Sequence, residues 1–141
     1  MNLFASLKAQ FVPRKPEHLR RGEIGERAAE KHLRALGLKF LTRNFRSKRG
    51  ELDLIFRDAD CLVFVEVKTR SSEVWNRPAA AVNTHKRRLL SRTALDYLRL
   101  IKNPQVKLRF DIVEVLLANG NVSKVRHLPN TFPLEKPYRY A

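Results

Sequence analysis

Two consecutive apolar segments joined by a short polar turn constrain the fold of this chain more than any other feature. The segments are residues 50–56 and 61–70, and both are rich in the β-branched and aromatic residues that are typical of strands. The residues between them are polar and few enough for a hairpin. The second segment contains the run Leu-Val-Phe-Val at 62–65, which is apolar on both faces and indicates a strand buried within a sheet. We therefore expect the chain to fold around this pair of strands.

Charged side chains interrupt these strands at Asp53, Glu66 and Lys68, where the core of a sheet would exclude charge. Glu66 and Lys68 are two residues apart, so their side chains leave the same face of the strand. Glu51 and Asp53 are spaced in the same way. Pairing of the strands in register would therefore gather two or three carboxylates and one ammonium group. The alternative is an ordinary surface hairpin with a Glu–Lys pair, and the buried apolar run argues against it.

Such a group of charges has a defined chemistry. Clustered carboxylates repel one another unless a cation joins them. Because all the ligands are oxygen atoms, the favoured cation is a hard divalent ion, Mg²⁺ or Mn²⁺. A lysine beside the ion can neutralise a phosphoryl oxygen, or help to position and deprotonate a water molecule. The combination is suited to hydrolysis of a phosphodiester.

The charge of the whole chain points to a polyanionic partner. The 141 residues are enough for one domain with a substantial core. Lysine and arginine number 29 against 14 aspartate and glutamate, which gives a net charge of +15. Such a field favours nucleic acid or an anionic membrane surface. We expect nucleic acid, above all DNA, and the alternative is a protein that is merely basic.

Cysteine usage and hydropathy indicate a cytoplasmic protein. The single cysteine, Cys61, rules out an intramolecular disulfide and fits a reducing compartment. The four histidines do not have the spacing of a zinc site. No apolar run approaches the roughly 18 residues needed to cross a bilayer. The N-terminus also lacks the long apolar region of a signal peptide. We therefore expect no transmembrane segment.

An amphipathic pattern predicts a first helix over residues 17–36, which ends at Gly37. Its apolar stripe consists of Ile24, Ala28, Ala29, Leu33 and Leu36. Glu26 lies about 20° from Leu33 around the helix axis, at the margin of the buried face. From there the carboxylate either reaches the charged edge of the sheet or points to solvent.

A second helix is predicted over 79–101, or broken near Asn83. Its apolar stripe consists of Val82, Leu89, Leu90, Ala94, Leu98 and Ile101. Lys86 lies about 40° from Leu90, on this stripe. It is either a second phosphate ligand or a lysine that extends its amine to solvent.

The remaining elements are strands. Residues 38–45 form the first strand, with Phe40 and Leu41 as core candidates, and residues 107–117 form a long buried strand. Asn119-Gly120 predicts a tight turn, after which 122–128 pairs back. Asp111 interrupts the long strand, and we expect it to form a salt bridge with an arginine rather than to bind metal. The chain thus divides into an extension at 1–16, a domain at 17–128 and an irregular tail at 129–141.

A basic stretch at 43–49 precedes the charged strand directly and surrounds Phe45. We interpret it as a loop over the candidate site that contacts phosphates, and the alternative is a solvated basic turn. The expected nucleic-acid contacts are Arg43, Arg46, Lys48, Arg49, Arg70, Lys86, Arg87 and Arg88.

Taken together, these motifs resemble a known family. The spacing Asp-(x)12-Glu-x-Lys resembles the PD-(D/E)xK nuclease core, although Leu52 replaces the proline. More closely, the chain resembles the YraN-type family of bacterial proteins over about residues 20 to 117. The matching segments are Gly-Glu-Ile-Gly-Glu-Arg-Ala-Ala at 22–29, Gly-Glu-Leu-Asp-Leu-Ile at 50–55, Phe-Val-Glu-Val-Lys-Thr-Arg at 64–70, His-Lys-Arg-Arg-Leu at 85–89 and Arg-Phe-Asp-Ile-Val-Glu-Val at 109–115.

The resemblance implies a restriction-endonuclease-like α/β fold, a three-layer core with a mixed central sheet of about five strands flanked by helices. The YraN-type family is also similar to archaeal Holliday-junction resolvases. This similarity makes Asp53, Glu66 and Glu26 the implied metal ligands and Lys68 the catalytic lysine, with Glu51 as an auxiliary candidate. The implied activity is Mg²⁺- or Mn²⁺-dependent cleavage of DNA, branched or otherwise structured, by a monomer or a homodimer. The alternatives are a nucleic-acid-binding protein without turnover and an interaction module on the same fold.

Overall fold

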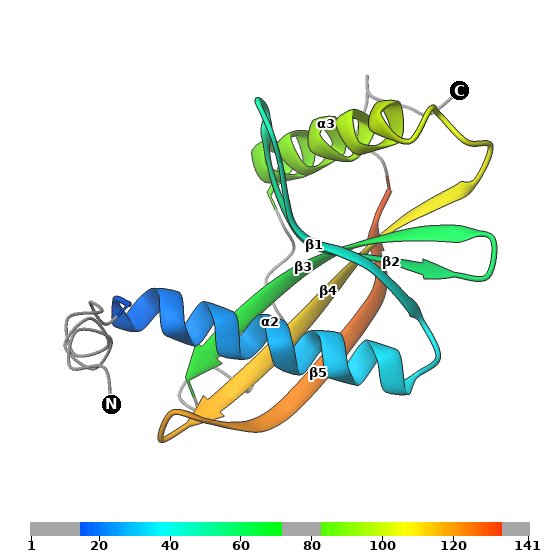
Figure 1. The fold of residues 1–141 in the computed structure, drawn as a ribbon. Coiled ribbons are helices and arrows are strands. Elements are labelled where there is room, and N and C mark those ends of the chain that lie inside the picture. Colours follow the sequence, from blue (N-terminus) through cyan, green and yellow to red (C-terminus); the bar gives the residue numbers. More distant parts are fainter. Residues whose placement is uncertain (1–14, 72–82, 134–141) are drawn as a thin grey trace, which may run out of the picture.

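Five strands form one mixed sheet, and a helix packs on each of its faces (Figure 1). The structure, a computed structural model, describes residues 15–71 and 83–133. Its elements are α2 (Glu17–Ala35), β1 (Lys39–Ser47), β2 (Gly50–Asp58), β3 (Cys61–Ser71), α3 (Thr84–Leu100), β4 (Lys107–Ala118) and β5 (Asn121–Phe132). This is the three-layer α/β architecture with a mixed five-stranded sheet that the family resemblance implies.

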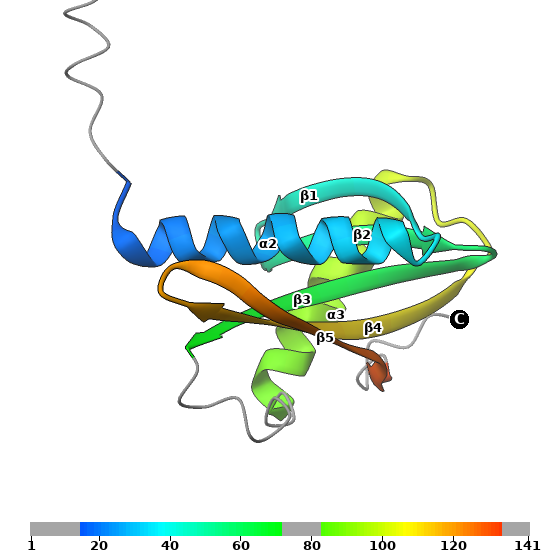
Figure 2. The same cartoon turned by 90° about the horizontal axis from the view of Figure 1, so that it is seen from below.

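The strands follow one another across the sheet in chain order, β1-β2-β3-β4-β5. β3 and β4 run parallel, with α3 in the connection between them, and the other neighbouring pairs are antiparallel. Figure 2 shows α2 lying along one face of the sheet and α3 crossing the other. The central position of β3 confirms the prediction from its apolar run.

Each helix covers its own hydrophobic cluster, and alternate residues of β3 contribute to both. Phe64 packs with Leu98 of α3, whereas Val63 and Val65 pack with Leu33 of α2. These side chains are at most 1% exposed, and burial of each stabilises the fold by about 1.5–3 kcal/mol. The sheet is therefore held rigidly between the two helices at its centre.

The helix boundaries follow local signals in the sequence. α2 is followed by Leu36 as its C-cap and by Gly37 at φ +94°, a left-handed conformation that glycine adopts readily. α3 begins after Asn83, whose side chain accepts a hydrogen bond from the backbone N–H of Lys86 at 2.9 Å. This cap places the start of the helix later than residue 79, and residues 79–82 lie outside the described part. Neither of the described helices is long and apolar enough to cross a bilayer.

Several predicted boundaries and core positions were wrong. Residues 43–47 are not a loop, because β1 continues to Ser47 and leaves a tight turn at 48–49. Leu41 is 41% exposed, because the register shifts between Phe40 and Thr42 and the bulge turns it away from the core. Leu36 and Ile101, at the helix ends, are also exposed.

The last strand also differs from its prediction. β5 runs on to Phe132, into the segment expected to be an irregular tail. The reason is a buried aromatic contact, since Phe132 stacks on Phe110 with ring centroids 4.7 Å apart. The expected extension and tail fall largely in residues 1–14 and 134–141, which lie outside the described part.

Candidate active site

The candidate site forms where β2 and β3 separate. Their pairing ends at Leu54 opposite Val65, and Asp53 and Glu66 are the next residues on the two strands. Asp53 Oδ2 accepts a hydrogen bond from the backbone N–H of Val67 at 2.8 Å. A carboxylate thus takes the place of the backbone acceptor that a continued ladder would supply.

β2 changes the side of the sheet that its alternate side chains face at the point where it separates from β3. Leu52 belongs to the cluster under α3, whereas Leu54 belongs to the cluster under α2. Residues two apart on a regular strand face the same side, so β2 twists strongly at Asp53. Beyond this point the β1–β2 hairpin lies beside α3 (Figure 1). The twist opens the sheet at the carboxylates.

Glu66 lies on the α3 side of β3, two residues after Phe64. Its side chain is 15% exposed, and its Oε1 lies 3.3 Å from Nζ of Lys86 in the first turn of α3. Lys68, the half-buried lysine of the Glu-x-Lys motif, follows on the same face. The lysine that pairs with Glu66 is therefore the one from the helix.

Glu26 approaches from α2, and a glycine allows that approach. The preceding residue, Gly25, is buried against Thr69 of β3, and a Cβ at this position would overlap the Thr69 hydroxyl. Glu26 is half-buried, and its pKa is raised by burial and by the nearby charge of Glu51, against which a hydrogen bond from Asn44 acts only in part. The helix glutamate therefore faces the site and not open solvent.

The three carboxylates of the site interact electrostatically. Burial, and next the charge of Glu66, raise the pKa of Asp53 from 3.8 to about 8, and Glu26 adds to the same effect. With this pKa the Asp53 carboxyl group is mostly protonated at neutral pH, and a bound cation would favour its ionised form. Two neighbouring oxygen donors that repel each other suit a hard divalent ion.

The side chains fit such an ion in part. Within residues 15–71 and 83–133, no three His, Cys, Asp or Glu side chains lie close enough together to hold a metal. Mg²⁺ commonly binds one or two carboxylates and completes its shell with water and substrate phosphate. Asp53 and Glu66 fit that mode, and Glu26 affects the pKa of Asp53 less than Glu66 does.

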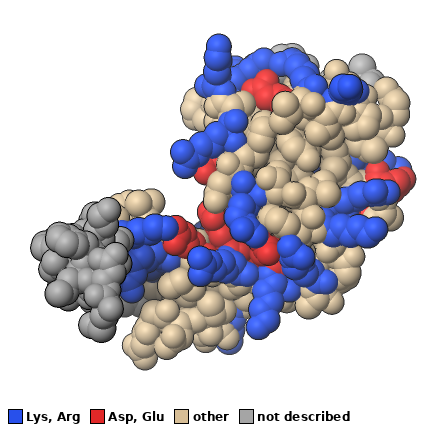
Figure 3. Space-filling model, viewed as in Figure 1, with Lys and Arg blue, Asp and Glu red and all other residues tan. Residues whose placement is uncertain are grey.

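Basic residues lie around the acidic side chains of α2. Figure 3 shows acidic side chains gathered in a hollow beside α2, with lysine and arginine around it. A pocket of about 390 Å³ lies beside α2 and is lined by Glu26, Glu30, Arg43 and Asn44, among others, but not by Asp53 or Glu66. An anionic backbone could thus be held around an acidic centre.

Many of the predicted nucleic-acid contacts form ion pairs within the protein. Arg43 pairs with Glu30 at 2.6 Å, Arg46 with Glu51 at 3.5 Å, and Arg49 with Asp96 at 3.5 Å. The three arginine side chains are 38–76% exposed, so these pairs stabilise the protein little and can open towards a phosphate.

Besides Lys86, which pairs with Glu66, four further predicted contacts differ in environment. Arg70 lies 3.3 Å from the fully buried Glu114, which gives it a structural partner inside the protein. Arg87 is half-buried and lies over the ring of Phe132 at 5.7 Å. Lys48 and Arg88 are exposed.

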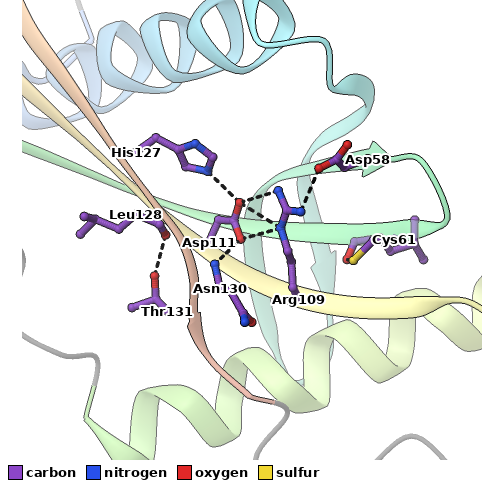
Figure 4. Close-up of polar contacts among 9 residues, drawn as sticks. Asp58, Cys61, Arg109, Asp111, His127, Leu128, Asn130 and Thr131 are labelled. Atoms are coloured by element: carbon purple, nitrogen blue, oxygen red, sulfur yellow. Dashed lines mark hydrogen bonds and ion pairs between the residues drawn. The ribbon is translucent and has the colours of Figure 1, made fainter.

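Asp111 belongs to a separate polar network, as expected from the sequence (Figure 4). It is fully buried and accepts hydrogen bonds from Arg109 Nε at 3.0 Å and from the backbone N–H of Asn130 at 2.9 Å, and His127 Nε2 lies 2.8 Å away. Burial alone would raise the pKa of Asp111, but the hydrogen bonds with His127 and Arg109 lower it. The salt bridge with an arginine is confirmed. Arg109 also donates a hydrogen bond to Asp58. The sequence did not predict the roles of His127 and Asp58 in this network, because both lie far from Asp111 along the chain.

Comparison with known proteins places the chain in a family. The model of the uncharacterised protein family UPF0102 matches residues 25–115. A UPF0102 protein of Trichlorobacter lovleyi is 39% identical over 114 residues, which cover 80% of this chain and 90% of that protein. A UPF0102 protein of Nocardia farcinica is 42% identical over 79% of this chain and 87% of its own length. A UPF0102 protein of Porphyromonas gingivalis is 40% identical over 84% of this chain and 87% of its own length. The matched segment includes Glu26, Asp53, Glu66 and Lys86, and the chain belongs to the UPF0102 family.

Proposed function

We propose that this protein is a PD-(D/E)xK-type endonuclease that uses Mg²⁺ or Mn²⁺ to hydrolyse phosphodiester bonds of DNA, branched or otherwise structured. One observation carries the proposal. Two carboxylates, Asp53 and Glu66, come together where two strands separate, and the ammonium group of Lys86 lies beside Glu66. Two carboxylates that repel each other and are largely removed from water are costly for the fold, whereas a metal nuclease requires such a pair.

The roles of the four site residues follow from their positions. Asp53 and Glu66 would hold the divalent ion, and Glu26 would complete or orient the ligand set from α2. When bound, such an ion lowers the pKa of a water molecule and stabilises negative charge on the phosphate. Lys68 leaves the same face of β3 as Glu66, so it would neutralise a phosphate oxygen or position the attacking water.

The charge of the chain supports a nucleic-acid substrate. The net charge is +15, and exposed cations such as Arg46, Lys48 and Arg88 can neutralise backbone phosphates. Two copies in a homodimer would place two sites for cleavage of both strands. The single cysteine suits the reducing cytoplasm, where we place the protein.

A second candidate function is nucleic-acid binding without turnover. It is favoured by the absence of three converging metal donors among the described residues. It is also favoured by the ion pair between Lys86 and Glu66, which satisfies one carboxylate without a metal. In that case Asp53 and Glu66 would be a structural network under a basic surface.

Cleavage of branched and linear DNA in Mn²⁺ or Mg²⁺ distinguishes the two functions. Asp53→Asn and Glu66→Gln are expected to lower the cleavage rate at least about 100-fold, because each removes a metal ligand, while DNA affinity measured without metal is kept. Asp60→Asn and Glu17→Gln make the same chemical changes at exposed positions and are expected to cleave like wild type. Equal cleavage by folded Asp53→Asn and wild type would contradict the nuclease. DNA binding by the wild type without cleavage of either substrate would support the binding protein.

A further inference from the structure

Lys86 brings a cation to the candidate active site from outside the Glu-x-Lys motif. Its Nζ lies 3.3 Å from Oε1 of Glu66. The lysine side chain is 49% exposed and that of Glu66 only 15%. Lys86 therefore reaches the carboxylate from the solvent side, the side from which a metal ion or a phosphate must also arrive.

The backbone of Lys86 is fixed, whereas its side chain can change partner. Asn83 caps α3 by accepting a hydrogen bond from the N–H of Lys86 at 2.9 Å, which anchors the residue in the first turn. Four methylene groups separate this anchor from the ammonium group, which can move without any change in the fold.

The charge of this turn is the reverse of the usual arrangement. Helix N-termini favour acidic residues, because the helix dipole is positive there. α2 follows that rule with Glu17, but the first turn of α3 contains no acidic residue and is followed at once by Arg87 and Arg88. Cations at the N-terminus of α3 are unfavourable in the free protein, and they become favourable when an anion binds to the first turn of the helix. This arrangement points to a phosphate as the second partner of Lys86.

Resting on the proposed function, we propose that Lys86 is the counter-ion of Glu66 in the metal-free site, that the divalent ion displaces it, and that the released ammonium group then binds a DNA phosphate. An ion pair with a half-exposed lysine is weak, whereas a divalent ion carries twice the charge to the same carboxylate. Exchange of Lys86 for the metal is therefore favourable. It couples the two ligands, because metal binding frees a cation for DNA and DNA binding frees a carboxylate for the metal.

The test compares Lys86→Met with Lys107→Met. The control also breaks a lysine–carboxylate pair, since Lys107 lies 3.6 Å from Asp60, but it is opposite Cys61 at the beginning of β3 and β4. In Mn²⁺ titration calorimetry without DNA, Lys86→Met is expected to bind Mn²⁺ at least about threefold more tightly than wild type, because the competing cation is gone. Lys107→Met is expected to match wild type.

Binding of phosphorothioate-protected branched DNA provides the second readout. Mn²⁺ is expected to raise the DNA affinity of wild type and of Lys107→Met about fivefold or more, and to raise that of Lys86→Met much less. Unchanged Mn²⁺ affinity in Lys86→Met, or an undiminished effect of Mn²⁺ on its DNA affinity, would overturn the role of Lys86 and leave the metal site standing. Absence of Mn²⁺ uptake by wild type and by Lys86→Met, with DNA present, would overturn the metal site itself and with it the role of Lys86.

Discussion

At the scale of single residues, Asp53 has two opposed requirements. The fold is more stable when its carboxyl group is protonated, whereas the proposed metal binding requires the ionised form. The pKa of Asp53 is about 8 in the folded protein against an ordinary value of 3.8, because it is buried beside Glu66. Between these pH values the folded state holds a proton that the unfolded state has lost, so the free energy of unfolding falls as the pH rises from about 4 to 8. The site is thus least stable in the ionised form that binds a metal.

Asp53→Asn is therefore expected to stabilise the metal-free protein. Asparagine keeps an acceptor for the Val67 N–H but never ionises. The expected gain in the free energy of unfolding is on the order of 1–3 kcal/mol at pH 9, and it disappears near pH 4. Urea unfolding in EDTA at the two pH values measures it, with Asp60→Asn as the exposed control. A loss of stability at pH 9 would show that Asp53 is well accommodated as a carboxylate.

At the scale of elements, the distance between α2 and β3 sets the position of Glu26. Gly25 and Gly22 lie on the same helix, but only Gly25 has β3 against it, and a Cβ on Gly22 would meet nothing within 4 Å. Gly22→Ala is expected to stabilise the protein by up to about 1 kcal/mol through helix propensity. Gly25→Ala is expected to destabilise it, because α2 must move away from Thr69, and to lower DNA cleavage.

Removal of the Thr69 hydroxyl tests whether close packing of α2 on β3 explains the need for glycine at position 25. The double variant Gly25→Ala/Thr69→Ala is expected to recover stability and cleavage partly towards wild type, because the overlapping hydroxyl group is gone and only the Cβ of residue 69, at 3.2 Å, stays close. Failure of Thr69→Ala to relieve either defect would show that Gly25 matters for some other reason than the close packing of α2 on β3.

The network of Asp111 joins β4 and β5 to the β2–β3 turn, through Arg109 and Asp58. Arg109→Met leaves a fully buried carboxylate with fewer partners, so we expect a loss of about 3 kcal/mol in the free energy of unfolding. Lys107→Met, which breaks an exposed pair, is expected to change it by less than about 0.5 kcal/mol. Urea unfolding compares them, and similar small losses would mean that His127 and Asn130 alone suffice for Asp111.

The elements differ in how far the sequence determines them. The turn at Asn119 and Gly120, both at positive φ, and the central strand were predictable because their signals are local. The bulge at Leu41 was not, since it depends on the register with β2. Asp53 and Glu66 could be identified as unusual charges in apolar strands. The partner of Glu66 could not, because Lys86 is distant in sequence and meets it only through the packing of α3.

At the scale of the whole molecule, the excess of positive charge should govern nucleic-acid affinity. Each phosphate neutralised on duplex DNA contributes about 0.9 to the slope of log affinity against log salt. Arg88 is exposed on α3, and Arg88→Gln is expected to reduce that slope by about 0.9 without altering preference among sequences. Lys107→Gln removes the same charge outside the proposed contact set and is expected to leave the slope unchanged. Equal slopes for Arg88→Gln and wild type would exclude Arg88 from the interface.

The central claim is that Asp53 and Glu66 bind a divalent cation. Its most direct test is Mn²⁺ titration calorimetry of wild type and Asp53→Asn, each saturated with phosphorothioate-protected branched DNA. We expect Mn²⁺ uptake by wild type, and uptake at least about 100-fold weaker in Asp53→Asn although its DNA affinity without metal is equal, because a carboxylate ligand is lost. Absence of Mn²⁺ uptake by folded, DNA-bound wild type, or equal uptake by Asp53→Asn, would contradict the claim.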